Sequence, residues 1–214
     1  MVDEKTGKLL EYRDLIRRPE LKETWTRSLA NELGRLAQGI HDVKAANTIF
    51  FVKKSEIPKD KLKRVTYARI VYGYKPNKLE KYRTRVTVGG DRIVCDYDIS
   101  SPTCDMPTIK LLWNSVVSTL GAKYFTMDIS NFYLGSPMDE PEYMRMPFNL
   151  MPEKIINKYQ LKDKEHDGWV YIKIVKGMYG LPQAGKLAKD LLKERLARFG
   201  YYPTNFIPGL WRHM

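Results

Sequence analysis

The sequence predicts a mixed α+β fold in which a β-hairpin and a sheet pack against helices. Leucines recur at three- and four-residue spacing over residues 19–39 and again over residues 183–200, which predicts an amphipathic helix in each region. Between them, residues 82–90 alternate strictly in side-chain character, as a half-buried strand does. With 214 residues, 43% of them hydrophobic and 29% charged, the chain has a composition typical of one or two globular domains.

The N-terminal part is expected to begin with a loose arm, because residues 1–18 are mostly polar. The folded domain is then expected to span residues 19–214. Pro19 suits the first turn of the first predicted helix, and Gly39 suits its end. Residues 48–52 (TIFFV) predict a short buried strand, which is followed by a polar loop.

A β-hairpin is predicted next. Residues 65–74 (VTYARIVYGY) are rich in β-branched and aromatic side chains, and a polar turn separates them from residues 82–90 (YRTRVTVGG). The alternation of the second strand places two arginines on one face, which is either a plain exposed surface or a surface that presents guanidinium groups to phosphates. The two faces carry Tyr82, Thr84, Val86 and Val88 on one side, and Arg83, Arg85 and Thr87 on the other.

The second half of the chain mixes helices and strands. A helix is expected from about Pro107 to Thr119, capped by Asp105 and with its apolar side facing inward. Residues 122–130 (AKYFTMDIS) predict an apolar strand that ends on Asp128. The remaining predicted elements are a strand at 141–146, a short helix at 153–160, a strand at 168–177 and the final helix, which stops at Gly200. The inward side of the helix at 107–119 is expected to comprise Ile109, Leu112, Trp113, Val116 and Val117, and that of the final helix Leu187, Leu191, Leu192 and Leu196.

The charge balance favours a polyanionic partner. Lys and Arg number 37 against 25 Asp and Glu, which gives a net charge of +12 and makes nucleic acid the first candidate, although a solvated basic surface is the alternative. Cys95 and Cys104 have no partner at zinc-ligand spacing and are expected to be free thiols. The N-terminus lacks the apolar run of a secretory signal, and no stretch has the length of a membrane span, so an intracellular protein without a membrane partner is expected.

Asp128 is the most informative position for chemistry. A carboxylate at the end of an apolar strand is expected at a sheet edge, where burial without a partner is costly. It therefore needs a donor, a cation or a metal, and Mg²⁺ usually binds one or two carboxylates together with substrate phosphates. The alternative is a cap for the turn that follows.

The surrounding residues resemble a known family. YFTMDISNFYLGSPM, around Asp128, resembles the first catalytic block of reverse transcriptases, and KGMYGLPQAG at 176–185 resembles their second block, especially the LYGLKQA form of copia-type LTR retrotransposons. KYRTRVTVGGD is similar to the KARLVARG finger strand of that family, CDYDISSPT to its DYDETFSPV crossing and WTRSLANELGRL to its opening helix. These five blocks stand in the family's order over most of residues 20–202.

The resemblance implies the fingers and a partial palm of a right-hand polymerase, acting as an RNA-directed DNA polymerase. Such enzymes use two Mg²⁺ ions about 3.5–4 Å apart to transfer a nucleotide to a primer. Asp128 would bridge both metals, and the carbonyl of Ile129 would help to hold the metal of the nucleotide. Tyr133, five positions later, would close the ribose pocket, or would simply pack in the core with Phe132.

The resemblance also implies the residues that meet the substrates. Arg85 is expected to bind the triphosphate, with Arg83 as second choice because so short a block can slip by one or two residues. Gln183 would lie against the nucleotide sugar and the arginine. Three lysines of the last helix would touch template phosphates, or would form a solvated face: Lys186, Lys189 and Lys193.

One family block is missing. No adjacent Asp-Asp pair occurs in the chain, and the sequence stops at PGLWRHM, where the family continues. One carboxylate of three should hold two Mg²⁺ weakly, so the chain alone is expected to lack polymerase activity and to be a fragment of a longer pol polyprotein or the product of a degenerate element.

The partners implied by the family are an RNA template, a DNA primer, deoxynucleoside triphosphates and the rest of the pol polyprotein, in the cytoplasm, a virus-like particle or the nucleus. A non-catalytic, basic nucleic-acid-binding module of the same fold is the main alternative. The basic charge disfavours an assembly domain unrelated to nucleic acid.

Overall fold

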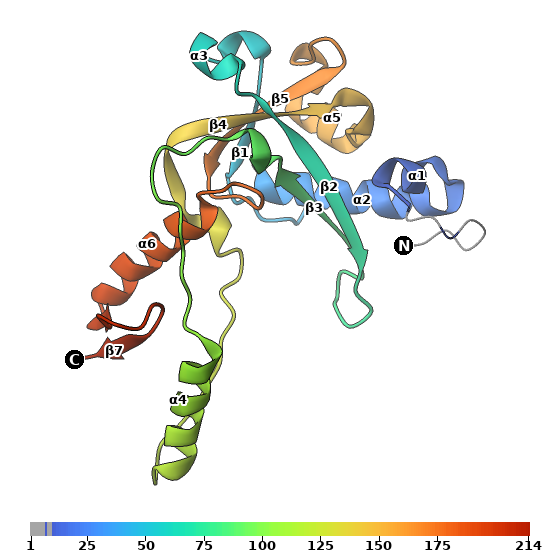
Figure 1. Cartoon of the computed structure of the whole chain (residues 1–214). Coiled ribbons are helices and arrows are strands. Elements are labelled where there is room, and N and C mark those ends of the chain that lie inside the picture. The colour runs from blue at the N-terminus through green and yellow to red at the C-terminus, as the bar shows by residue number, and fades with distance from the viewer. Residues whose placement is uncertain (1–6, 8–9) are drawn as a thin grey trace.

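The computed structural model describes residue 7 and residues 10–214. Its centre is a five-stranded sheet, accompanied by helices on one face and at both ends, which confirms the mixed α+β class (Figure 1). The strands lie in the order β1 (Ile49–Val52), β5 (Trp169–Lys176), β4 (Pro137–Pro147), β2 (Thr66–Tyr74) and β3 (Tyr82–Val88). All five were predicted, although β4 begins earlier than expected.

The sheet consists of two parts that are joined at one corner. β5 pairs antiparallel with both β1 and β4, and β2 pairs antiparallel with β3 from Ala68 opposite Val88 to Tyr74 opposite Tyr82, which confirms the predicted hairpin. The two parts meet only where Thr66 and Tyr67 of β2 run parallel to Met144 and Arg145 of β4. The hairpin therefore diverges from β4 along most of its length (Figure 1).

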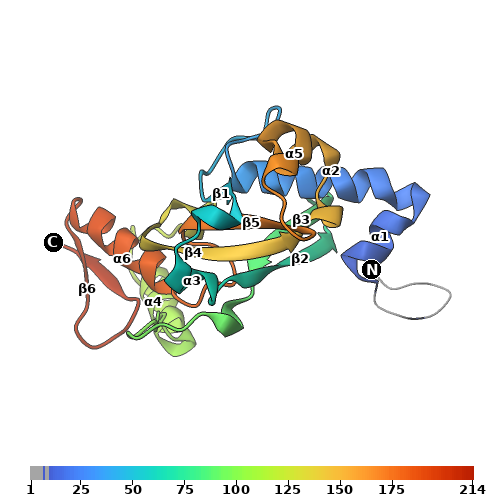
Figure 2. The same ribbon diagram turned by 90° about the horizontal axis from the view of Figure 1, so that it is seen from above.

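The helices α2 (Pro19–Leu36) and α5 (Glu153–Tyr159) cover one face of the sheet (Figure 2). The predicted leucine stripe of α2 is confirmed, because Trp25, Leu29 and Leu33 are fully buried in the main core. Across from them lie buried residues of the strands: Ile49, Val86, Met144, Met146, Ile172 and Ile174.

The expected N-terminal arm is partly wrong. Residues 12–17 form helix α1 (Tyr12–Arg17), in which Tyr12 and Leu15 are buried. The Tyr12 hydroxyl donates to the carbonyl of Trp25 at 3.3 Å, which ties α1 to α2. Residues 1–6 and 8–9 lie outside the described residues. The polar loop after β1 also contains a short helix, α3 (Lys59–Leu62).

Helix α4 (Met106–Ser118) forms as predicted, and the Asp105 carboxylate caps it by accepting from the Thr108 amide at 2.9 Å. However, α4 projects away from the sheet, and none of its residues is buried (Figure 1). The expectation that its apolar side faces inward is therefore wrong. The chain leaves the body along one segment to reach α4 and returns along another (Figure 1).

The predicted strand at 122–130 is also wrong. Residues 122–130 are exposed and form no strand. They follow α4 and precede the short turn at Tyr133–Gly135. The backbone of residues 123–128 makes no hydrogen bond with any described residue. A strand exists only through pairing with another strand, and no strand in the described part of the chain pairs with this segment.

The C-terminal part begins with α6 (Ala184–Ala197), which confirms the last predicted helix. Its small residues Ala184 and Ala188 are buried, whereas the leucines expected to face inward are only half-buried. A small hairpin of β6 (Tyr201–Pro203) and β7 (Trp211–His213) follows and was not predicted. In the part of the chain that the structure describes, no helix combines the length and the apolar character needed to cross a membrane.

Candidate functional site

The loop of residues 177–183 is hydrogen-bonded on one side to the β2–β3 hairpin and on the other to Ser136, at the end of the short turn that follows Asp128. The amide of Val88, at the end of β3, donates to the carbonyl of Tyr179 at 2.8 Å. On the other side, the amide of Gly177 donates to the carbonyl of Ser136 at 2.7 Å. Three regions that are separated by tens of residues in the sequence therefore meet at this loop.

Gly180 makes the close approach possible. Its φ of +93° lies in the region that L-residues rarely adopt, and a Cβ at this position would clash with the carbonyl oxygen of Val88. Gly90 faces it from the hairpin side, where a Cβ would clash with the carbonyl oxygen of Gly180. The loop that leads into LPQAG is thus held against the β2–β3 hairpin by backbone contact, which a side chain on either glycine would prevent.

Arg85 lies over aromatic rings at this junction. Its guanidinium carbon is 4.8 Å from the ring centroid of Tyr179, and the ring of Tyr133 meets Tyr179 edge to face, with centroids 5.4 Å apart. The Arg85 side chain forms no hydrogen bond or ion pair with any residue that the structure describes. Its five N–H donors therefore remain available to an anion.

Arg83 has different surroundings. Its Nε is buried without a hydrogen-bond partner, and its charge acts on Glu32 of α2. Burial raises the pKa of the Glu32 carboxyl, and the neighbouring Arg35 and Arg83 oppose that rise. Arg83 therefore faces an acidic group, whereas Arg85 does not.

Tyr133 is half-buried and contacts two aromatic side chains. In addition to Tyr179, it meets Phe132 with ring centroids 5.7 Å apart. Both contacts fit the packing interpretation of Tyr133. The contact with Tyr179 also links it to Arg85, as the nucleotide interpretation requires.

Gln183 belongs to the same loop but lines a pocket that does not include Arg85. It is buried, and its side-chain oxygen accepts from the Cys95 thiol at 3.7 Å. It lines a pocket of about 370 Å³ together with Tyr97 and Glu142. Burial raises the pKa of both Cys95 and Glu142. This pocket includes neither Arg85 nor Asp128, and the Gln183 side chain forms no hydrogen bond with either of them in the described chain.

Asp128 is exposed and has no hydrogen bond or ion pair with a described residue. The expectation of a carboxylate at a buried sheet edge is wrong, because the predicted strand lacks a sheet. Ile129 lines a small pocket of about 100 Å³ with Phe132 and with residues of α6, among them Arg195.

The donor set around Asp128 does not fit two Mg²⁺ ions. Each ion needs several oxygen ligands, and one exposed carboxylate beside the Ile129 carbonyl supplies few of them. Among the described residues, no group of three or more His, Cys, Asp or Glu side chains is arranged to hold a metal ion.

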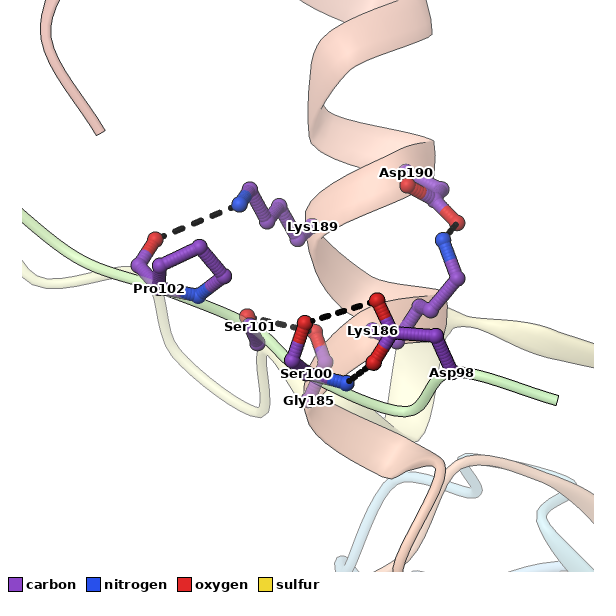
Figure 3. Close-up of polar contacts among 8 residues, drawn as sticks. All are labelled: Asp98, Ser100, Ser101, Pro102, Gly185, Lys186, Lys189 and Asp190. Carbon is purple, nitrogen blue, oxygen red and sulfur yellow. Dashed lines mark hydrogen bonds and ion pairs between the residues drawn. The ribbon is translucent and has the colours of Figure 1, made fainter. Parts of the chain in front are cut away.

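The start of α6 is fastened to the crossing at residues 98–102 (Figure 3). Ser101 donates through its hydroxyl to the Gly185 carbonyl at 3.4 Å, and Lys189 donates to the carbonyl of Pro102 at 3.2 Å. Asp98 accepts from the amide and the hydroxyl of Ser100, at 2.8 and 2.9 Å, and these hydrogen bonds lower the pKa of its carboxyl.

The three predicted lysines of α6 differ in whether their ammonium groups already have a partner. Lys186 is paired with Asp190 at 2.9 Å, an ion pair whose hydrogen bond raises the pKa of the ammonium (Figure 3). Lys189 is held by the crossing, and Lys193 is exposed with no partner among the described residues. Only Lys193 therefore offers an ammonium group without an existing contact.

Tyr179 is the functional candidate that sequence reasoning missed. It belongs to the KGMYGLPQAG block, but its pairing with Arg85 joins positions that are 94 apart and could not be found from local pattern. Arg85 on its aromatic support offers a guanidinium to a phosphate, and Lys193 of α6 separately offers an exposed ammonium group. Comparison of the chain with protein-family models, with curated proteins and with solved structures found no match.

Proposed function

We propose that the chain comprises the fingers and the first part of the palm of a copia-type RNA-directed DNA polymerase. The observation that carries this proposal is the convergence at Arg85, Tyr179 and Tyr133. These residues come from the three blocks that resemble the finger strand, the second block and the first catalytic block of the family. Because they are far apart in the sequence, their meeting is independent of the local motifs.

Arg85 is proposed to bind the nucleotide triphosphate. A guanidinium supported by an aromatic face keeps its charge and its forked donors, which match phosphate oxygens. The carboxylate beside Arg83 makes that residue the poorer choice, because an anion there would meet Glu32 as well. Tyr133, at the edge of Tyr179, is proposed to border the sugar.

Nucleotide transfer by these 214 residues alone is not part of the proposal. The residues present do not fit the two-metal centre, and the sequence contains no Asp-Asp pair. The proposed role of the chain alone is therefore to bind a nucleotide and an RNA–DNA duplex. Activity requires carboxylates from outside these residues.

The second candidate is a basic module that binds nucleic acid without any catalytic role. The net charge of +12 and the exposed position of Asp128 favour it. The two candidates share the polyanionic partner and differ in whether Arg85 recognises a triphosphate and whether Asp128 matters.

The first test measures binding of a deoxynucleoside triphosphate to the chain by calorimetry. Arg85→Ala should weaken binding by about tenfold or more, because a charge-assisted hydrogen bond contributes roughly 1.5–3 kcal/mol. The matched control is Arg69→Ala, which removes an exposed arginine that lies 5.5 Å from the Tyr67 ring on the same hairpin. Equal affinities for both variants and the parent chain would contradict the proposal.

The second test is primer extension, which separates the two candidates. The chain is compared with a version that includes the coding sequence downstream, each with and without Asp128→Asn. Synthesis by the longer version that Asp128→Asn abolishes supports the polymerase. Binding of an RNA–DNA duplex without synthesis by either version supports the non-catalytic module.

A further inference from the structure

Residues 105–130, here called the α4 surface, carry ten of the exposed large hydrophobic residues of the described chain. It consists of α4 and the extended segment that returns from it to the body (Figure 1). Every large hydrophobic residue in the following set is at least 44% exposed: Met106, Leu111, Leu112, Trp113, Val117, Leu120, Tyr124, Phe125, Met127 and Ile129.

The α4 surface needs a partner to be stable. An isolated helix shorter than about 12–15 residues is marginal in water, and α4 has 13 residues of which none is buried. The backbone of residues 123–128 has no hydrogen-bond partner in the described chain, so it presents an open edge. An exposed apolar helix and an unpaired backbone edge are both expected of an element that packs against another molecule.

The charge of this region identifies the kind of partner. Residues 105–130 contain two acidic side chains, Asp105 and Asp128, and two basic ones, Lys110 and Lys123, so their charges cancel. The net charge of +12 therefore lies entirely on the rest of the chain. A polyanion has no electrostatic reason to bind here, whereas two copies of a basic chain can approach each other at this neutral face without strong repulsion.

We propose that a second copy of this chain covers the α4 surface. An aromatic side chain buries roughly 150–250 Å² and an aliphatic one less, so the exposed parts of these ten side chains offer on the order of 1,000 Å² per copy if an interface covers all of them. A standard interface needs about 800 Å² from each partner, so the area is sufficient for a stable dimer.

The extended segment provides a geometry for this dimer. Tyr124 packs edge to face on Trp113 of α4, with centroids 5.8 Å apart, so one face of the segment is turned to the helix. Side chains alternate along an extended chain, which turns Phe125 and Met127 to the opposite face. Around a two-fold axis, residues 123–128 of the two copies pair antiparallel and bring these side chains of both copies together.

The test is sedimentation velocity of the 214-residue chain over a range of concentrations. The parent chain should show a reversible equilibrium between its 25.0 kDa monomer and a dimer, and the dimer should persist at high salt because its contact is apolar. Phe125→Asp/Met127→Asp should weaken association by about a hundredfold or more, since each apolar side chain that is no longer buried costs roughly 1.5–3 kcal/mol.

The matched control is Asn77→Asp/Leu79→Asp in the exposed turn of the β2–β3 hairpin, which changes the charge by the same amount and should leave the dimer intact. All variants should keep the thermal midpoint of the monomeric body, because none of these side chains is buried. A parent chain that stays monomeric, an open series of larger aggregates, or equal association of both double variants would overturn the proposal. Self-association does not depend on nucleotide binding, so this result is independent of the proposed function.

Discussion

Arg83 and Arg85 leave the same strand two residues apart but meet different neighbours. Arg83 shares its surroundings with the buried carboxyl of Glu32, whereas Arg85 lies on the ring of Tyr179 with no acidic partner among the described residues. The sequence alone left the choice between them open, because so short a block can slip by one or two residues. The contacts with other elements distinguish them, and these contacts depend on the tertiary fold.

Gly180→Ala should destabilise the protein. The positive φ and the clash with the Val88 carbonyl both oppose a Cβ, and a residue held in such a backbone region costs roughly 1–3 kcal/mol before the clash is counted. For a chain of this size that corresponds to a fall of roughly 2–4 °C in Tm per kcal/mol. Gly135→Ala is the control, because its Cβ would meet nothing within 4 Å. Equal Tm values for the two variants would contradict this account of the loop.

Glu32 should make stability depend on pH in a specific direction. Burial raises the pKa of its carboxyl in the folded chain, so the folded state binds this proton more tightly than the unfolded state. The stability contributed by this group is therefore fully present at acidic pH and is lost as pH rises from the ordinary pKa of Glu to the raised value.

Urea unfolding at several pH values tests this expectation for Glu32. The Glu32→Gln variant keeps an acceptor for the Val86 amide and for Arg35 but cannot ionise, so it should lack that part of the decline. Glu20→Gln, at an exposed site on the same helix, should follow the parent chain. A parallel pH dependence of the Glu32→Gln variant and the parent chain would show that Glu32 does not titrate as described.

Among the elements, those with a strong local pattern were predicted, whereas short elements were missed and one apolar segment was predicted as a strand that the described chain does not form. The leucine stripe of α2 and the alternation of β3 specify both the type of element and its buried face. The apolar segment at 122–130 has the composition of a strand, but pairing requires a neighbour that the described chain does not supply. Helix α1 was missed because a helix of six residues, of which only Tyr12 and Leu15 are buried, is too short to show a hydrophobic periodicity.

Asp105 should control how well α4 is formed. Its carboxylate accepts from the Thr108 amide, and this hydrogen bond lowers the pKa of Asp105 below the ordinary value. In Asp105→Ala, the amides of the first turns of α4 should exchange with deuterium several-fold faster, because α4 buries none of its residues among the described ones and depends on its cap. Asp105→Asn retains a capping oxygen and should behave like the parent chain, while the amides of β5 should be unchanged in both variants.

For the whole molecule, the mixed α+β class is confirmed, whereas the candidate site is only partly assembled. Arg85 and Tyr133 lie together, but Gln183 lines a separate pocket and Asp128 is exposed. Sequence blocks identify residue types and their order, but the position of each side chain depends on whether its supporting element is complete. The element that carries Asp128 is the one without a sheet partner.

The basic charge of the molecule should give salt-dependent binding of nucleic acid. Fluorescence anisotropy with a labelled RNA–DNA duplex should show log affinity falling linearly with log salt concentration. Lys193→Ala should reduce the slope by about 1 if this free ammonium contacts a phosphate. Lys186→Ala should have a smaller effect, because Asp190 already neutralises that side chain. A slope that neither variant changes would exclude this face of α6 from the contact.

The neutral α4 surface has a further consequence for how charge is arranged. The charges of residues 105–130 cancel and the remaining chain carries the full +12. Each monomer therefore has a neutral α4 surface and a basic body. Two monomers joined through their neutral ends point their cationic bodies outward, in opposite directions. Such a pair is bivalent towards a long polyanion, and the second body engages at the high local concentration that the first one creates.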